Sequence, residues 1–311
     1  MTISTGQRKS NVLVPSSLRC LSGMPTINIT SGCAHGCLYC YGSGYPTYPG
    51  EGKILLYANI AEKVSDELKR KRKKPRAAYF CPSCDPFQNL PEVLKLTYQT
   101  MEILLKNNIG VQFVTKARVP DRFVSLFEKY PSLVCGQVGL ITADDSLRRI
   151  FEPNASPVSE RVSCLKKLAE AGIEISLRAD PLIHGVTDSD KQIRALCEIA
   201  SQNGLAEIAV GYMFLRPPIR RSLARSIGER DLLQKVLEPY SNGKWLEMVS
   251  SNSKVLVLPR EMRAKSFERI KRIAGKYGVT IRLCGCKNPD ITTESCNITR
   301  PVDNRESSLF D

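Results

Sequence analysis

The stretch TSGCAHGCLYCYG (residues 30–42) places Cys33, Cys37 and Cys40 close together, directly after a predicted strand at Thr26–Ile29. Three thiolates on one loop can hold three corners of a cubane iron–sulfur cluster. The fourth iron then has no protein ligand, and an open metal position is typical of a catalytic site. The stretch therefore predicts a 4Fe–4S cluster that can bind a small chelating ligand.

A zinc site is the alternative interpretation of the same cysteines, with His35 as the fourth ligand. His35 lies between Cys33 and Cys37, a spacing that zinc modules do not normally use.

The composition is ordinary for a globular protein, and its positive charge favours negatively charged partners. The chain has 311 residues, and its 45 Lys and Arg against 31 Asp and Glu give a net charge of +14. This surplus favours DNA or another polyanion. No secretory signal or membrane span is visible, so we expect a cytoplasmic location without membrane contact. Twelve cysteines beside two histidines predict iron–sulfur or zinc ligation rather than disulfides.

Short apolar runs alternate with amphipathic segments, which predicts parallel α/β architecture. The predicted strands are Thr26–Ile29, Ala77–Phe80, Val111–Thr115, Val138–Ile141, Ile173–Leu177 and Ile208–Tyr212. The predicted helices between them are Ala58–Arg72, Pro91–Asn107, Asp121–Tyr130, Pro157–Ala171 and Ser189–Asn203. Six such repeats predict a partial (β/α)6 TIM-like barrel, with its site at the carboxyl ends of the strands.

The alternation ends near Pro217, and this divides the chain into three parts. We expect an N-terminal segment at 1–24, a core domain at 25–216 and a cysteine-containing C-terminal extension at 217–311. The extension has predicted helices at Glu229–Leu237 and Arg260–Tyr277, with a strand-like KVLVLP between them.

The cysteine spacing resembles the signature of the radical SAM superfamily, in which an aromatic residue such as Tyr39 commonly precedes the third cysteine. The resemblance implies that the open iron binds S-adenosylmethionine. It also implies a flavodoxin- or ferredoxin-type electron donor. The expected chemistry is reductive cleavage that yields a 5′-deoxyadenosyl radical, which abstracts hydrogen from a substrate.

Further motifs resemble the spore photoproduct lyase, or DNA-photolyase-like, branch of that superfamily. They follow the order of that branch over roughly residues 25–215. They are CLYCY at the cluster, FCPSCDPFQNLPE after the second strand, Thr115-Lys116 after the third, Glu152-Pro153 with Arg161 and LAEAGI, and RADPLIHG from Arg178.

The resemblance also implies contacts to the cofactor. Ser83 and Lys116 match positions that contact its methionine carboxylate, and a lysine is a suitable point charge for that group. Asp85 is expected to hold the amino group or to cap the next helix. Tyr39 and Arg178 complete the expected cofactor-binding set.

Cys81 matches a cysteine that returns a hydrogen atom to the product in spore photoproduct lyases. Two alternatives remain open. Cys81 and Cys84 form a CxxC pair that could ligate an auxiliary cluster, and Cys81 could also be an inert thiol.

The remaining cysteines divide into a tail group and single positions. Cys284, Cys286 and Cys296 follow a predicted strand closely enough to suggest the ligands of an auxiliary iron–sulfur cluster. Cys135, Cys164 and Cys197 occur singly on predicted strands or helices, which is typical of packed apolar cysteines. Cys20 carries no local signal.

These features favour a radical SAM enzyme with spore photoproduct lyase-like DNA lesion repair as the leading function. A second hypothesis is radical SAM modification of a peptide, protein or RNA with an auxiliary cluster. A third, from another class, is a metal-stabilised nucleic-acid-binding protein without catalysis.

Overall fold

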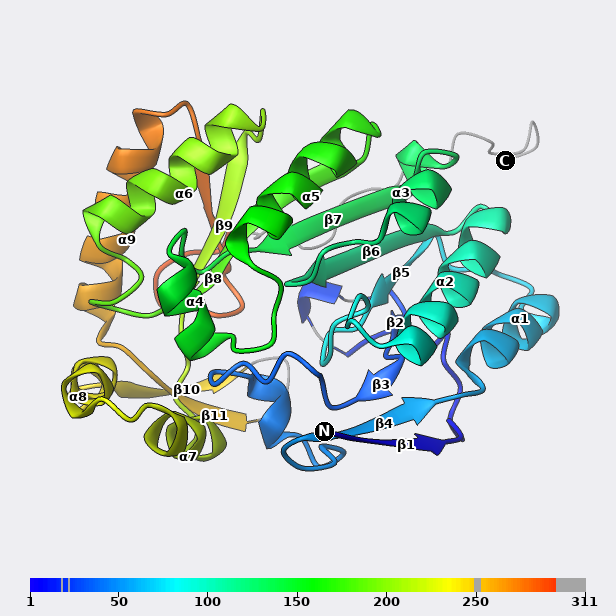
Figure 1. The fold of residues 1–311 in the computed structure, drawn as a ribbon, viewed down its shortest axis with the longest axis horizontal. Coiled ribbons are helices and arrows are strands. Elements are labelled where there is room, and N and C mark those ends of the chain that lie inside the picture. Colours follow the sequence, from blue (N-terminus) through cyan, green and yellow to red (C-terminus); the bar gives the residue numbers. More distant parts are fainter. Residues whose placement is uncertain (18, 22, 249–252, 295–311) are drawn as a thin grey trace.

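A seven-stranded parallel sheet organises the computed structural model, which describes residues 1–17, 19–21, 23–248 and 253–294. The strand order is β12-β9-β8-β7-β6-β5-β2, so the sheet is open, with β12 and β2 at its edges. Figure 1 shows the strands from β9 to β2. The strands are β2 (Thr26–Ile27), β5 (Ala77–Phe80), β6 (Gly110–Thr115), β7 (Val134–Gly139), β8 (Glu174–Leu182), β9 (Glu207–Tyr212) and β12 (Thr280–Leu283). This confirms the predicted α/β class and the open, partial TIM-like barrel.

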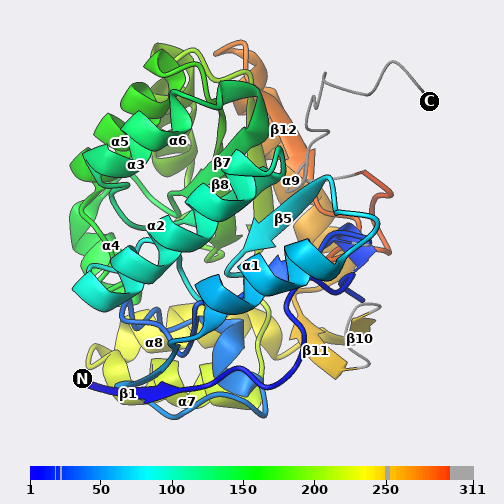
Figure 2. The same ribbon diagram turned by 90° about the vertical axis from the view of Figure 1, so that its right-hand side faces the viewer.

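Helices cover one face of this sheet, as Figure 2 shows. They are α2 (Pro91–Lys106), α3 (Asp121–Phe127), α5 (Val158–Glu170) and α6 (Asp190–Gln202), with α1 (Ile60–Arg70) packed on α2. In α6 the residues Ile193, Leu196, Cys197 and Ala200 are buried, which is the spacing of one helix face. The core therefore lies between the sheet and these helices, and the opposite face is left for the functional site.

Three strands differ from their predictions by two residues or more. The strand predicted at Ile173–Leu177 is β8, which continues to Leu182. The strand predicted at Thr26–Ile29 is β2, which ends at Ile27. The chain then leaves the main sheet, because Thr30–Ser31 (β3) pairs with β4 (Lys53–Tyr57). These two strands and β1 (Thr2–Gly6) form a separate sheet. The predicted Val138–Ile141 is β7, which begins at Val134. Every residue of β7 is buried, so no alternation of apolar and polar residues marks its start.

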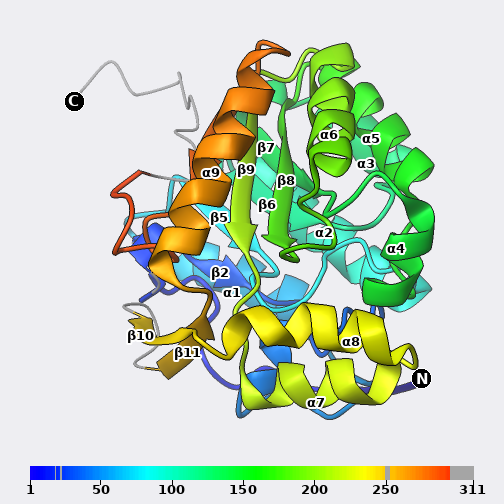
Figure 3. The ribbon, with the colours of Figure 1, turned by 90° about the vertical axis from the view of Figure 1, so that its left-hand side faces the viewer.

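The C-terminal extension contributes the seventh strand, which six predicted repeats did not include. β12 pairs in parallel with β9, the last strand of the predicted core. The predicted helices are present as α8 (Arg230–Leu237) and α9 (Arg260–Gly275), and α7 (Pro217–Ser226) is an addition (Figure 3). The strand-like segment is β11 (Ser253–Val257), which pairs with β10 (Lys244–Met248). The proposed division at residues 24 and 216 stays a prediction.

No helix among the described residues is both long enough and apolar enough to span a membrane.

Candidate active site

A cavity of about 290 Å³ contains most of the residues predicted from the sequence. Cys33, Cys37 and Cys40 line it, and so do Tyr39, Cys81, Ser83, Asp85, Lys116, Arg178, Cys284 and Cys286. Cys296 lies outside the described residues. The cavity is found where parallel strands end, because Cys81 follows β5 and Lys116 follows β6.

The cysteine loop is held by backbone hydrogen bonds to distant parts of the chain. Leu38 N donates to Phe151 O at 2.9 Å, and Asn154 N donates to His35 O at 3.2 Å. Gly36 has a φ of +61°, which a residue with a side chain adopts only with strain. The loop therefore has a defined path between the first and third cysteines.

The environment of the three thiols suits metal-bound sulfur. Burial raises the pKa of Cys33, Cys37 and Cys40 above the ordinary value, so that each thiol is neutral unless a positive charge is nearby. Backbone N–H groups oppose this rise in part: those of Gly42 and Ser43 lower the pKa of Cys40, and that of His35 lowers the pKa of Cys33. Such amide contacts stabilise cluster ligands, and iron would supply the charge that each thiolate needs.

Gly42 allows the chain to turn closely around the third cysteine. A Cβ at this position would lie 3.1 Å from Ser83 O and 3.4 Å from Cys40 Sγ. The donor set, its amide contacts and this close turn all fit a cluster.

The thiols do not form a single-ion site. No three His, Cys, Asp or Glu side chains in the described part of the chain are placed to hold one metal ion. Four ligands around one zinc would stand about 4 Å apart, given zinc–sulfur bonds of about 2.3 Å. His35, the fourth ligand of the zinc hypothesis, instead places Nε2 3.1 Å from Asp85 Oδ2.

Asp85 joins the cysteine loop to the ends of two strands. Its carboxylate accepts hydrogen bonds from Lys116 N at 2.7 Å, Thr115 Oγ1 at 2.8 Å and Phe87 N at 2.9 Å. Burial alone would raise the pKa of Asp85, but the contact with His35 and the backbone hydrogen bonds from Lys116 and Phe87 lower it overall. The residue is thus an ionised anchor whose oxygens are engaged within the protein.

Cys81 occupies an unusual conformation beside the cavity. Its φ is +55°, its side chain is 4% exposed, and its N donates to Ile27 O at 2.8 Å. The Cys81 thiol forms a hydrogen bond with that of Cys84, and Ser83 Oγ donates to Asn28 Oδ1 at 2.9 Å. Non-glycine residues in this conformation cluster at functional sites.

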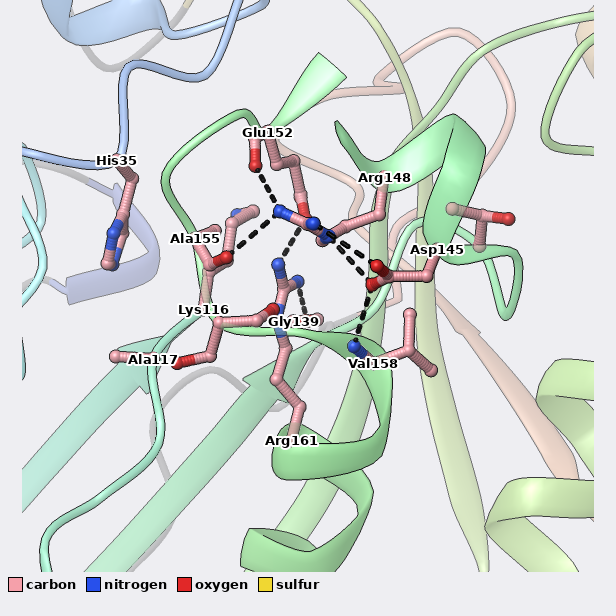
Figure 4. Close-up of polar contacts among 12 residues, drawn as sticks. His35, Lys116, Ala117, Gly139, Asp145, Arg148, Glu152, Ala155, Val158 and Arg161 are labelled. Atoms are coloured by element: carbon pink, nitrogen blue, oxygen red, sulfur yellow. Dashed lines mark hydrogen bonds and ion pairs between the residues drawn. The ribbon is translucent and has the colours of Figure 1, made fainter. Parts of the chain in front are cut away.

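A buried polar group supports the aromatic residue of the cysteine motif. The Tyr39 hydroxyl donates to Glu152, whose Oε2 lies 2.6 Å from Arg161 Nη2. Figure 4 shows Arg161 reaching from α5 to Glu152 and to the carbonyl of Gly139, at 2.8 Å. Lys116 Nζ lies 5.7 Å from the centre of the Tyr39 ring. The sequence motif contained Glu152 and Arg161, but their joint contact with Tyr39 appears only in the structure.

Charged residues from β8 and from the loop after β12 form another wall of the cavity. Arg178 Nη2 lies 2.5 Å from Asp180 Oδ2 and its Nη1 donates to Gln137 Oε1 at 3.0 Å. Lys287, from the loop after β12, forms an ion pair with Asp180 and lies 4.7 Å from the centre of the Phe214 ring. The motif that begins at Arg178 contained Asp180 but assigned it no role, and Lys287 was missed from the sequence because it has no local signal.

A profile of the Radical SAM superfamily matches residues 27–197, which is more than half of the chain. The chain belongs to the radical SAM superfamily. For a radical SAM protein this membership implies a 4Fe–4S cluster and S-adenosylmethionine.

Two curated relatives illustrate its sequence similarity. A "Radical SAM Nalpha-GlyT isomerase" of Pseudomonas phage M6 is 25% identical over 257 residues, which are 81% of this radical SAM chain and 51% of that enzyme. The chain therefore spans about half the length of that relative. An uncharacterized protein of Mycobacterium tuberculosis (strain ATCC 25618 / H37Rv) is 23% identical over 279 residues, 85% of this chain and 76% of that protein.

Solved structures share the fold. A spore photoproduct lyase complexed with dinucleoside spore photoproduct has a TM-score of 0.65 and 16% identity, covering 90% of this chain and 81% of its own. A variant of that lyase with bound AdoMet and the same dinucleoside has a TM-score of 0.66 and 17% identity over the same shares. These likenesses confirm the radical SAM fold expected from the motifs.

Proposed function

We propose that this radical SAM protein abstracts hydrogen from a damaged nucleotide and thereby repairs DNA in the manner of a lyase. When bound, the cluster and S-adenosylmethionine supply a 5′-deoxyadenosyl radical by reductive cleavage, with the electron taken from a flavodoxin- or ferredoxin-type donor. The observation that carries the proposal is the single cavity shared by the three motif cysteines and Cys81.

The cavity offers a division of roles among the protein's own residues. Cys33, Cys37 and Cys40 would hold the cluster, while Ser83 and Lys116 would receive the methionine carboxylate of the cofactor. Tyr39, Arg178 and Asp85 would complete the cofactor-binding set; Asp85 would act indirectly, by orienting the Lys116 backbone. Cys81 would then give a hydrogen atom from its thiol to the product radical, and the thiyl radical left on Cys81 would return to the thiol with one electron from the same donor and one proton.

The walls of the cavity suit a nucleotide. Tyr41, Tyr45, Tyr79 and Phe214 line it, and aromatic rings can stack on an extruded base. Arg178, Arg216 and Lys287 line it as well, and cationic groups attract phosphate. A nucleic-acid substrate is consistent with these residues and with the net charge of +14.

Release of 5′-deoxyadenosine tests the enzyme class. We expect the anaerobically reconstituted protein to release it from S-adenosylmethionine in dithionite, and the Cys33→Ala/Cys37→Ala/Cys40→Ala variant to release none. Cys197→Ala, a buried cysteine on α6, serves as the matched control and should keep the activity. An intact cluster without this release would favour a nucleic-acid-binding protein without catalysis.

Turnover of a dinucleoside spore photoproduct tests the substrate. We expect Cys81→Ala to keep the release of 5′-deoxyadenosine and to lose the repaired dinucleoside, because only the hydrogen-returning thiol is missing. If the parent protein releases 5′-deoxyadenosine but leaves the lesion intact, modification of a peptide, protein or RNA becomes the better hypothesis. The cytoplasmic location stays a prediction.

A further inference from the structure

Besides Cys81 and Cys84, three further cysteines outside the radical SAM motif line the same cavity, although they come from opposite ends of the chain. They are Cys20, Cys284 and Cys286. Cys20 lies in a short 3-10 turn (Arg19–Leu21) just before β2, and Cys284 directly follows β12. Because β2 and β12 are the two edges of the open sheet, these cysteines flank its open side.

The loop after β12 is firmly built. Cys284 O accepts hydrogen bonds from Asn288 N at 2.9 Å and Lys287 N at 3.0 Å. Arg263, on α9 and 2% exposed, donates to Asn288 Oδ1 at 2.8 Å and pairs with Asp290 Oδ2 at 2.6 Å. A nearly fully buried arginine thus holds the turn that carries the two tail cysteines.

The position between those cysteines admits only glycine. Gly285 N donates to Glu294 O at 2.9 Å, so the loop closes on itself here. A Cβ at position 285 would lie 2.9 Å from Thr292 O and 3.0 Å from Glu294 O. The spacing of Cys284 and Cys286 is therefore set by the backbone. Figure 3 shows this loop (red) on the side of the sheet away from α5 and α6.

Sulfur is the common chemistry of this group. Both histidines of the chain are engaged elsewhere, since His35 contacts Asp85 and His184 Nδ1 lies 3.0 Å from Asp188 Oδ2. A thiolate-only set at the rim of a radical SAM cavity suits an iron–sulfur cluster better than a mixed Cys/His zinc site. We propose that Cys20, Cys284 and Cys286 ligate a second iron–sulfur cluster, which joins the two ends of the chain across the open side of the sheet.

This proposal keeps Cys284 and Cys286 of the tail set predicted from the sequence and adds Cys20, which the sequence did not single out, while Cys296 lies outside the described residues. It does not depend on the proposed DNA substrate or on hydrogen transfer by Cys81. It requires only that these three thiols bind iron and sulfide in the folded chain.

The test measures iron and acid-labile sulfide in protein reconstituted anaerobically with ferrous iron and sulfide. In the Cys33→Ala/Cys37→Ala/Cys40→Ala variant we expect about half of the parent's iron and sulfide, because one of two four-iron clusters remains. Adding Cys20→Ser, Cys284→Ser and Cys286→Ser should remove the rest. Adding Cys164→Ala and Cys197→Ala to that variant instead should leave the remaining iron and sulfide unchanged, since both cysteines are buried in the core.

Circular dichroism and gel filtration confirm that each variant is folded, and Cys20→Ser alone provides a milder change at a half-buried position. A folded variant without the motif cysteines that retains no iron would overturn the proposal. Iron retained after all six substitutions would also overturn it and would point to Cys81 and Cys84. Bound zinc without sulfide would exclude a cluster.

One further variant separates this proposal from the proposed function. Cys20→Ser/Cys284→Ser/Cys286→Ser in the otherwise unchanged chain should lose half of the iron and still release 5′-deoxyadenosine. A parent protein with two clusters but no such release would contradict the proposed function and leave the second cluster standing.

Discussion

Arg161 Nη2 lies 2.6 Å from Glu152 Oε2, and neither side chain has any exposed surface. Arg161 also donates to Gly139 O, at the end of β7, while Glu152 receives the hydroxyl of Tyr39. This ion pair therefore connects α5, a strand end and the cysteine motif. It supports the site without lining the cavity.

Removal of one partner should destabilise the protein strongly. We expect Arg161→Met to lower the free energy of unfolding by about 3–5 kcal/mol, because it leaves the Glu152 carboxylate buried without a countercharge. Glu152→Gln/Arg161→Met should recover part of this loss. Guanidinium titration measures both. Lys166→Ala, which breaks the exposed pair with Glu170, is the control and should change stability by at most about 1 kcal/mol. If Arg161→Met lowers the free energy of unfolding no more than Lys166→Ala does, the prediction is contradicted.

Asp188 should make stability depend on pH. Burial opposes its ionisation, but hydrogen bonds from His184 and Tyr212 outweigh burial and lower the pKa of Asp188. Arg269 on α9 faces the same carboxylate at 3.4 Å. A carboxyl group whose pKa is lower in the folded state than in the unfolded state stabilises the fold at pH values above its unfolded-state pKa of about 3.9. This stabilisation is lost as the pH falls through the folded-state pKa.

We therefore expect Asp188→Asn to be less stable than the parent at pH 7, with a difference that shrinks below about pH 4. Urea unfolding between neutral and acidic pH measures it. Asp66→Asn, whose partner Lys69 is largely exposed, should show little difference at any pH. A gap for Asp188→Asn that widens on acidification would refute this account.

Gly36→Ala should disturb the cluster rather than only the fold. An alanine at a φ of +61° costs about 1–2 kcal/mol, and its Cβ would also lie 3.4 Å from Asn154 Nδ2. Because Gly36 lies between Cys33 and Cys37, we expect less iron in the reconstituted protein. Gly204→Ala has a similar φ of +68° with no atom within 4 Å, so it should cost similar stability and keep the iron. Equal iron in both variants would show that the loop tolerates the strain.

Lys116→Ala should weaken binding of S-adenosylmethionine. A hydrogen bond to a charged group contributes about 1.5–3 kcal/mol, so the dissociation constant should rise about tenfold or more. Anaerobic equilibrium dialysis measures this affinity, and Lys116→Arg should retain part of it. Lys106→Ala, at the exposed end of α2, is the charge-matched control. Unchanged affinity in Lys116→Ala would remove this residue from the cofactor site.

Local pattern was sufficient for much of the fold. The predicted strand Ala77–Phe80 is β5 itself, and the predicted Pro91–Asn107 exceeds α2 by one residue. Proline at the helix start and apolar residues at helical spacing are signals within a few residues of one another. The superfamily was also recognisable from sequence, because Cys33, Cys37 and Cys40 lie on one short loop and need no distant partner. Their role as ligands stays a prediction.

Contacts across the chain were decided only by the tertiary structure. Cys20 and Cys284 are far apart in sequence, and neither has a local pattern that indicates the other; the parallel order of the sheet brings both to its open side. The same holds for Lys287 beside Asp180 and for β12 beside β9. The amino-acid sequence by itself thus determined the superfamily and the expected cluster loop, since both depend on neighbouring residues. The composition of the cavity walls depended on strand order, which short-range periodicity does not specify.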